Sequence, residues 1–369
     1  MSRDEPVPEI PEPRANPELL GHAAAEAALR GAFDGGRLHH AWLISGPRGI
    51  GKATLAYRFA RFVLAKGPAG GGAAGLFAEA ELPETGEGLY VSTDDPVFRR
   101  VAAGGHTDLL AIQRSENDRG VLRTEIVVDD VRKTQGFFHL TAGEGGWRVI
   151  VVDSADEMNT NAANALLKVL EEPPPRALLL LVSHNPGRLL PTIRSRCQKL
   201  RLDALSPEIV GALLHRYAPD MAEADIETTA MLAEGSIGRA LDLAASGGLG
   251  IYGQVMDLLD GVPDLDIPAL HDFAAKCAAK KGADTFSAAA ELMRWTMGRL
   301  VKHVGGGGEV LMEREARLFG RIGPAASLDR WLQVWEKVDE LLTSADRANL
   351  DRKQVILNAF SAVAQVTRS

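Results

Sequence analysis

A glycine-rich segment that could hold phosphate lies near the N-terminus. Residues 46–54 read Gly-Pro-Arg-Gly-Ile-Gly-Lys-Ala-Thr. Phosphate-binding loops have the pattern Gly, four residues, Gly-Lys, then Ser or Thr, and Gly46, Gly51 and Lys52 fit it. The backbone N–H groups from Gly49 to Lys52 are expected to point at phosphate oxygens from the N-terminal end of a helix, and Lys52 adds a positive charge. We therefore predict a phosphate-binding loop that contains Gly46, Gly49, Gly51 and Lys52.

The last position of this pattern is altered. Ala53 stands where Ser or Thr normally supplies a hydroxyl to Mg²⁺, the ion that neutralises charge between the β- and γ-phosphates. Thr54 carries a hydroxyl, but one residue along a helix rotates a side chain by about 100°, so this hydroxyl should point elsewhere. We predict a degenerate nucleotide site that includes Thr54 and holds Mg²⁺ poorly. The residues leave the binding of ATP or ADP open, and no cofactor is assigned.

A second motif begins with the apolar run 149–152, which is typical of a buried strand. Asp153 follows it directly, at the position where nucleotide-hydrolysing proteins of this kind hold the hydration shell of Mg²⁺. A glutamate that polarises the attacking water usually comes next, but this chain has Ser154. Asp156 and Glu157 lie just beyond, and both are best interpreted as helix-start carboxylates favoured by the helix dipole. The motif indicates a site without ATPase activity of its own.

A third motif, at residues 190–197, reads Leu-Pro-Thr-Ile-Arg-Ser-Arg-Cys. Arginine suits phosphoryl transfer because its planar fork stays charged and can grip the charge that spreads over the transferring group. Arg196 is therefore a candidate arginine finger. The alternative is a surface arginine in an ordinary ion pair, and the residues alone favour that alternative.

The segments around these motifs alternate between strands and helices. Apolar runs predict strands at 41–45, 108–113, 147–152 and 177–183. Helical patterns fall at 17–34, 53–64, 127–138 and 159–170. This alternation predicts an α/β fold, a parallel sheet covered by helices on both faces.

From residue 205 onward the pattern is helical. We predict a disordered leader at 1–16, an α/β phosphate-loop domain at 17–204, a small helical lid at 205–248 and a helical domain at 249–369. One helix of the last domain carries the apolar residues Trp331, Leu332, Val334, Trp335 and Val338. Such a helix needs a partner or a core of its own. We predict an oligomerisation domain, and a self-contained bundle is an equally good alternative.

Composition limits the possible functions. The 369 residues carry a net charge of -8, which argues against a chain coated in nucleic acid. The two cysteines, Cys197 and Cys277, cannot form the four-ligand site that structural zinc needs, so no zinc is expected. The acidic, proline-rich N-terminus lacks the basic start and apolar core of a secretory signal, and no apolar run could span a membrane. We expect a cytoplasmic protein with no membrane partner.

Three segments together resemble the clamp-loader subunits of the AAA+ class. They are residues 40–52, residues 161–174 and Ser195-Arg196-Cys197, which matches the Ser-Arg-Cys signature of clamp loaders. The resemblance covers most of residues 20–203 and implies a P-loop AAA+ domain, a helical lid and an all-helical C-terminal collar. The motor subunits, gamma and tau, keep the two residues that Ala53 and Ser154 replace here. The chain is therefore most similar to the delta-prime family of bacterial DNA polymerase III.

This resemblance implies a role and a set of partners. Delta-prime subunits are regarded as rigid stators that offer the Ser-Arg-Cys arginine to ATP on a neighbour, which implies that Arg196 acts in trans. The implied partners are gamma/tau motor subunits and a delta subunit in a hetero-pentamer, the sliding clamp, and primed DNA contacted through the assembly. One alternative is a catalytically active AAA+ ATPase with degenerate motifs. A small-molecule P-loop kinase is disfavoured, because it would leave the Ser-Arg-Cys motif unexplained.

Three parts of the chain depart from the family pattern or match it only in part. Many relatives carry four zinc-binding cysteines after the phosphate-loop helix, and this chain has none there. Residues 235–241 resemble the segment with the second sensor arginine, but Arg239 is displaced by one position from the motor-subunit pattern. Ser183 occupies the first sensor position, where the alternative is an ordinary strand-end residue.

Overall fold

The computed structural model divides into two compact units. The structure describes residues 11–66, 88–139, 146–279, 283–307, 312–347 and 350–368. Unit 1 consists of Met1–Pro219 with Glu234–Gly238, and unit 2 consists of Asp220–Ala233 with Arg239–Ser369. The first ten residues of the predicted leader lie outside the described residues. The predicted boundaries at 205 and 249 stay predictions.

Unit 1 contains a five-stranded parallel sheet. The strands are β1 (Ala41–Ser45), β2 (Leu109–Ile112), β3 (Arg148–Val152), β4 (Ala177–Ser183) and β5 (Gln198–Arg201). Their order is β2-β3-β4-β1-β5, and every neighbouring pair is parallel. The predicted parallel α/β sheet is confirmed. The edge strand β5 was not predicted, because its four residues are mostly charged or polar and only its pairing with β1 identifies it.

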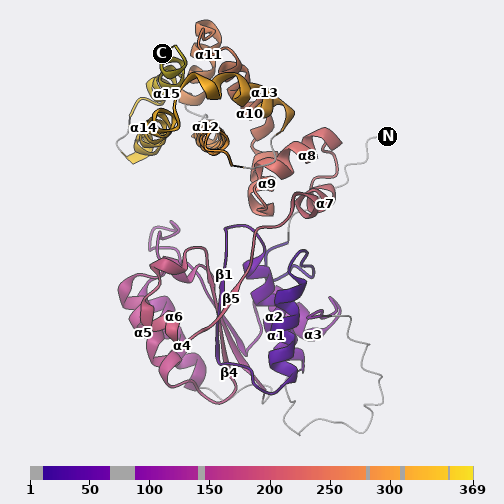
Figure 1. Ribbon diagram of the computed structural model, residues 1–369. Helices are drawn as coiled ribbons and strands as arrows, with labels where there is room; N and C mark the ends of the chain where they lie inside the picture. The colour runs from indigo at the N-terminus through magenta and orange to yellow at the C-terminus, as the bar shows by residue number, and fades with distance from the viewer. Residues whose placement is uncertain are drawn as a thin grey trace. The chain divides into compact units, whose positions relative to one another are not determined.

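Helices cover both faces of the sheet (Figure 1). One face carries α1 (Ala23–Asp34), α2 (Lys52–Lys66) and α3 (Pro96–Ala102), and the other carries α4 (Val128–His139), α5 (Thr160–Glu171) and α6 (Pro191–Ser195). Successive strand residues alternate between the two cores. In β1, Trp42 and Ile44 belong to the α1–α2 side, whereas Ala41 and Leu43 belong to the α4–α5 side. This alternation follows from the two-residue repeat of a strand that is buried on both faces.

Two buried arginines hold the segment that leads into α1. The guanidinium of Arg61 is 1% exposed and donates to the carbonyls of Arg14 (2.7 Å) and Asn16 (2.6 Å). Arg58, also on α2, donates to the carbonyl of Pro17 and pairs with Glu26. Residues 14–17 are thus held against α2, although most of them fall in the predicted disordered leader. The helix predicted from residue 17 begins only at Ala23.

Unit 2 is helical, as predicted for the C-terminal part. After α7 (Pro207–Tyr217) of unit 1 come α8 (Glu223–Leu232), α9 (Ile237–Ala245), α10 (Gly248–Asp260), α11 (Ile267–Ala278), α12 (Ala283–Val304), α13 (Glu313–Ile322), α14 (Leu328–Arg347) and α15 (Arg352–Thr367). Short 3₁₀ turns are η1 (Ala155–Glu157), η2 (Pro186–Arg188) and η3 (Gly323–Ala325). Within the described ranges, no helix is long and apolar enough to cross a membrane.

The apolar residues of α14 pack mainly into a core inside unit 2. Trp331 and Val338 are fully buried there, and Val334 and Trp335 pack against the same cluster. Leu332, at 36% exposure, faces outward. The alternative of a self-contained bundle therefore accounts for this apolar pattern. The prediction of an oligomerisation domain loses its main argument and stays untested.

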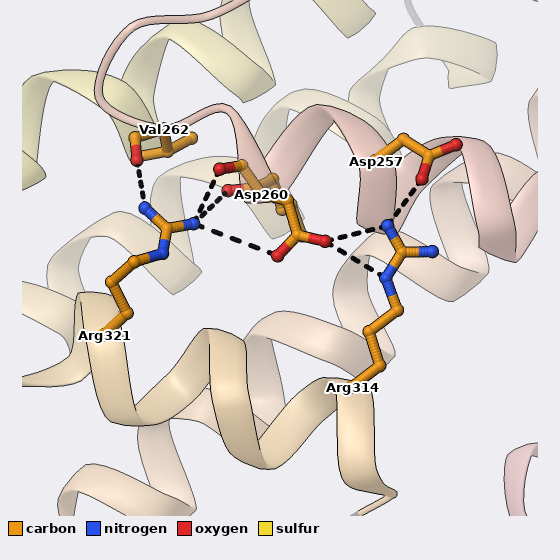
Figure 2. A network of polar contacts seen from close by, with 6 residues as sticks. Asp257, Asp260, Val262, Arg314 and Arg321 are labelled. Carbon is orange, nitrogen blue, oxygen red and sulfur yellow. Dashed lines mark hydrogen bonds and ion pairs between the residues drawn. The ribbon is translucent and has the colours of Figure 1, made fainter.

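Ion pairs tie α13 to the end of α10 (Figure 2). Arg314 donates to Asp257 (2.5 Å) and to Asp260 (2.8 Å). Arg321 donates to the backbone carbonyls of Asp260 (2.8 Å) and Val262 (2.5 Å). The last carbonyls of a helix have no partner within it, so a guanidinium placed there satisfies them and favours the negative end of the helix dipole.

Candidate functional site: a degenerate phosphate loop and a separate arginine

The phosphate loop connects β1 to α2, in the strand-loop-helix context that the sequence predicts. Gly46, Gly49 and Gly51 have φ values of 151°, 74° and 99°, which side chains rarely adopt. A Cβ atom at Gly46 would lie 2.3 Å from the Leu202 carbonyl oxygen, and one at Gly49 would lie 2.3 Å from Ser236 Oγ. Glycine is required at both positions by conformation and by space.

The loop keeps the groups that a phosphate needs. Among the described residues, the N–H groups of Gly49, Ile50 and Gly51 donate to no other backbone or side-chain group. Lys52, the first residue of α2, is 3% exposed and donates from Nζ to the Pro47 carbonyl. Burial lowers the pKa of Lys52 to about 8, although the nearby carboxylates act to raise it. The amine is therefore mostly protonated at neutral pH, and the cradle fits an oxyanion.

The loop lacks the hydroxyl that normally binds Mg²⁺. Ala53 has no side-chain oxygen, and the neighbouring Thr54 is buried within α2. Burial is the largest influence on Asp153 and raises the pKa of this carboxyl, against a hydrogen bond from the Ser154 N–H. No cluster of three or more metal-ligating side chains occurs in the part of the chain that the structure describes. The loop therefore keeps the groups that a phosphate needs, whereas position 53 has no hydroxyl for Mg²⁺, and weak binding of Mg²⁺ stays a prediction.

The two carboxylates after β3, Asp156 and Glu157, form contacts that the sequence did not indicate. Both lie in η1, a turn of three residues, rather than at the start of an α-helix. Asp156 accepts hydrogen bonds from the backbone N–H groups of His184 (2.9 Å) and Asn185 (3.2 Å). Glu157 pairs with Arg114 at 3.0 Å. Asp156 and Glu157 thus lie in the first turn of a short 3₁₀ helix, and the Asp156 carboxylate in addition joins the ends of β3 and β4.

This junction also involves Ser154 and His184. Ser154 has a left-handed backbone (φ 60°), and its Oγ lies 3.2 Å from His184 Nε2. Burial, followed by the charge of Lys52, lowers the pKa of His184. Burial raises the pKa of Asp156, but hydrogen bonds, first that of the His184 N–H, outweigh it and lower the pKa overall. No local pattern could have revealed this pairing, because residues 154 and 184 meet only when β3 and β4 are neighbours.

Ser183, which occupies the predicted first-sensor position, lies at the end of β4 and is fully buried. Its hydroxyl lies beside the Asp156 carboxylate and contributes to the lowered pKa of that group, although no hydrogen bond of ordinary geometry joins the two. Arg239 instead pairs with Glu291 of α12 at 2.8 Å, within unit 2.

Arg196 lies directly after α6. Its Nη2 pairs with Glu171 Oε1 at 2.9 Å, and its Nη1 donates to the Thr192 carbonyl at 3.1 Å. The side chain is 36% exposed. Because α5 and α6 cover one face of the sheet and α2 the other, Arg196 is separated by the sheet from the helix that begins at Lys52. The neighbouring Cys197 is buried, which raises the pKa of its thiol to about 11 and makes it unreactive.

The chain is similar to several known proteins. Residues 74–206 match a family described as DNA polymerase III, delta subunit. The chain is 36% identical over 233 residues to DNA polymerase III subunit delta' of Pseudomonas aeruginosa, covering 63% of each chain. It is 28% identical over 262 residues to DNA polymerase III subunit tau of Escherichia coli, covering 69% of this chain and 37% of that protein.

The chain is also similar to a third relative and to one solved structure. DNA polymerase III subunit gamma/tau of Mycobacterium tuberculosis (strain H37Rv) is 31% identical over 205 residues, covering 55% of this chain and 31% of that protein. The match thus spans less than two thirds of the length of each of these relatives. A gamma subunit-related protein of Thermotoga maritima covers 93% of this chain and 99% of its own at 18% identity. The TM-score between the two structures is 0.40.

Proposed function

Because this chain belongs to the clamp-loader family of DNA polymerase III, we propose that it is a non-hydrolysing subunit, of the delta-prime type, that supplies Arg196 to ATP bound by a neighbouring motor subunit. The observation that carries the proposal is the placement of two groups in unit 1. The phosphate loop keeps its backbone N–H groups and Lys52 but has Ala53 in place of a Mg²⁺ ligand, and Arg196 lies on the face of the sheet opposite α2. An arginine that its own site cannot use suits a site on another chain.

The proposal includes partners of matching chemistry. A motor subunit of the gamma/tau type would place its ATP against the α5–α6 side of unit 1, where the guanidinium could reach the γ-phosphate. The delta subunit, the sliding clamp and primed DNA would enter through the complete assembly, which we propose is a hetero-pentamer. The similarity to delta' and gamma/tau subunits supports this choice of partners.

The isolated chain is expected to show no ATPase activity above background. Ala53 provides no ligand for Mg²⁺, and Ser154 provides no carboxylate to polarise water. The measurement is phosphate release from Mg²⁺-ATP by the purified chain and by a Lys52→Ala variant, and we expect equal rates. Mg²⁺-dependent turnover that disappears in the Lys52→Ala variant would instead support the alternative of an active AAA+ ATPase.

The ion pair of Arg196 with Glu171 must open if the arginine acts in trans. Exposed ion pairs contribute about 0–1 kcal/mol, so opening this one reduces the available arginine by a factor of about five at most. Replacing Glu171 by alanine is therefore expected to leave folding unchanged and to keep or raise, up to about fivefold, the ATPase of the assembly. Glu172→Ala is the matched control, because Glu172 is the next exposed carboxylate. A Glu171→Ala assembly with much lower ATPase than the control would contradict a simple holding role for Glu171.

A further inference from the structure

A hollow lies on the surface of unit 2 between α14 and α15. Its volume is about 310 Å³. It is lined by Arg330, Gln333, Val334 and Lys337 of α14, and by Ala362, Gln365 and Val366 of α15. We call it the α14–α15 groove. None of these residues belongs to the phosphate loop or to the surroundings of Arg196, so the groove is a separate feature of the molecule.

The groove combines an apolar floor with a cationic rim. Ala362 and Val366 are buried and Val334 is half-buried, whereas Arg330 and Lys337 are exposed. Residues 330, 334 and 337 recur at helical spacing and therefore share one face of α14. The small side chain of Ala362 leaves the space that larger residues would fill. A ligand would meet hydrocarbon at the centre and one positive charge at each end.

Several arginines of unit 2 are held in ion pairs. They are Arg314 with Asp257 and Asp260 (Figure 2), Arg299 with Glu315, and Arg294 with Asp339. Neither Arg330 nor Lys337 forms an ion pair with any residue that the structure describes. Two exposed cations without an ion pair beside an apolar hollow offer positive charge to an acidic ligand, although α14 also carries the exposed carboxylates Asp329, Glu336 and Glu340.

We propose that the α14–α15 groove binds an acidic segment of a partner protein in an extended conformation, with the pattern acidic-x-apolar-x-acidic. Lys337 lies seven positions after Arg330 on the same helix, a rise of about 10.5 Å. Side chains of an extended peptide alternate between faces, and residues four apart are about 13 Å apart on the same face. The central apolar side chain would rest on Val334, Ala362 and Val366, and the flanking carboxylates would reach the two cations. The long lysine, arginine and glutamate side chains span the remaining 2–3 Å, roughly two bond lengths.

The apolar floor of the groove favours a protein ligand over a nucleic acid. A single-stranded nucleic acid could also use two cations, but its phosphates would gain nothing from a valine and alanine floor. Aromatic side chains on which bases stack are normal in such sites. The residues that line this groove are aliphatic, polar or cationic, and none is aromatic.

The test uses the full chain and a labelled peptide. The probe is Ser-Glu-Ser-Leu-Ser-Glu-Ser with blocked ends and a fluorescein label, and binding is measured by fluorescence anisotropy at low ionic strength. We expect saturable binding. Replacing both glutamates by glutamine, or the leucine by serine, is expected to weaken binding about fivefold or more, because each change removes one part of the complementarity.

Charge reversal in the groove provides the second arm. The double variant Arg330→Glu/Lys337→Glu is expected to bind the peptide about tenfold more weakly than the natural chain. The matched control is Arg317→Glu/Lys276→Glu, which changes the net charge equally at two exposed cations of α13 and α11. Because charge reversal can disturb folding, Arg330→Gln/Lys337→Gln is measured as well, and its loss of affinity should be smaller but in the same direction.

Four outcomes would overturn the proposal. They are no saturable binding at millimolar peptide, equal weakening by the groove and control variants, no effect of replacing the leucine, and tighter groove-dependent binding of a labelled twelve-nucleotide oligo(dT) than of the peptide. The last result would assign the groove to nucleic acid. The test does not depend on Arg196 or on ATP, so its failure leaves the proposed clamp-loader role untouched.

Discussion

Replacing Arg196 by alanine is expected to lower the ATPase of the motor subunit that faces it, with folding and assembly intact. Arginine fingers contribute roughly 10³–10⁵ in rate in well-studied GTPases. A ring with several active interfaces dilutes the loss of one finger, so the net decrease in steady-state ATPase should be smaller. The decrease should be largest when clamp and primed DNA stimulate turnover. The measurement is the ATPase rate of the reconstituted assembly, with single-turnover kinetics to isolate the affected site.

Two further variants make this prediction specific. Arg196→Lys should not restore activity, because an ammonium cannot reproduce the planar fork that grips two oxygens. Arg188→Ala serves as the control, since Arg188 is an exposed arginine of η2 close to α6 in the sequence. The Arg196→Ala variant could instead assemble and support unchanged ATPase and clamp loading. Arg196 would then have only a structural role, through its contacts with Glu171 and Thr192.

Replacing Glu315 by glutamine is expected to destabilise unit 2 by about 3–5 kcal/mol, the usual effect of removing one charge of a buried pair. Glu315 is fully buried and forms two parallel hydrogen bonds with Arg299, of 3.0 Å and 2.9 Å. It also accepts the Met312 N–H at 3.0 Å, at the start of α13. The guanidinium of Arg299 lies 4.7 Å from the ring centre of Trp295 and would remain buried without the carboxylate.

Hydrogen exchange over residues 283–307 and 312–322 would measure this effect, because it reports the opening of α12 and α13 separately from unit 1. The double replacement Arg299→Met/Glu315→Leu should recover part of the loss, since a buried ion pair can be exchanged for apolar side chains of similar size. Arg314→Ala, in the more exposed pairs of Figure 2, should have a smaller effect. A loss below about 1 kcal/mol for Glu315→Gln would show that water or a rearrangement solvates Arg299.

The sequence predicted the local features of unit 1 closely. The strands expected at 41–45 and 177–183 are β1 and β4 with the same bounds, and the helix expected at 159–170 is α5, shifted by one residue. The glycine and lysine spacing located the phosphate loop between its strand and helix. These features depend on residues within a few positions of one another, so the pattern along the chain contains the information.

Other features required partners from distant parts of the chain. The polar strand β5 exists because β1 offers it an edge, and residues 14–17 are held because Arg58 and Arg61 reach their carbonyls. Composition alone predicted disorder for most of that segment, since it could not show which buried guanidinium groups would satisfy the backbone.

The difference between local patterns and contacts between distant segments also applies to the functional residues. By itself the sequence determined that the phosphate loop lacks a metal ligand, that no carboxylate follows Asp153, and that Arg196 lies within a Ser-Arg-Cys motif. Only the tertiary structure decided that Asp156 joins two strand ends and that Arg196 pairs with Glu171 on the face of the sheet opposite α2. It also decided that most apolar residues of α14 pack into the core of unit 2. The type of a residue limits the chemistry that it can perform, whereas its partners are set by packing between segments that are far apart in the chain.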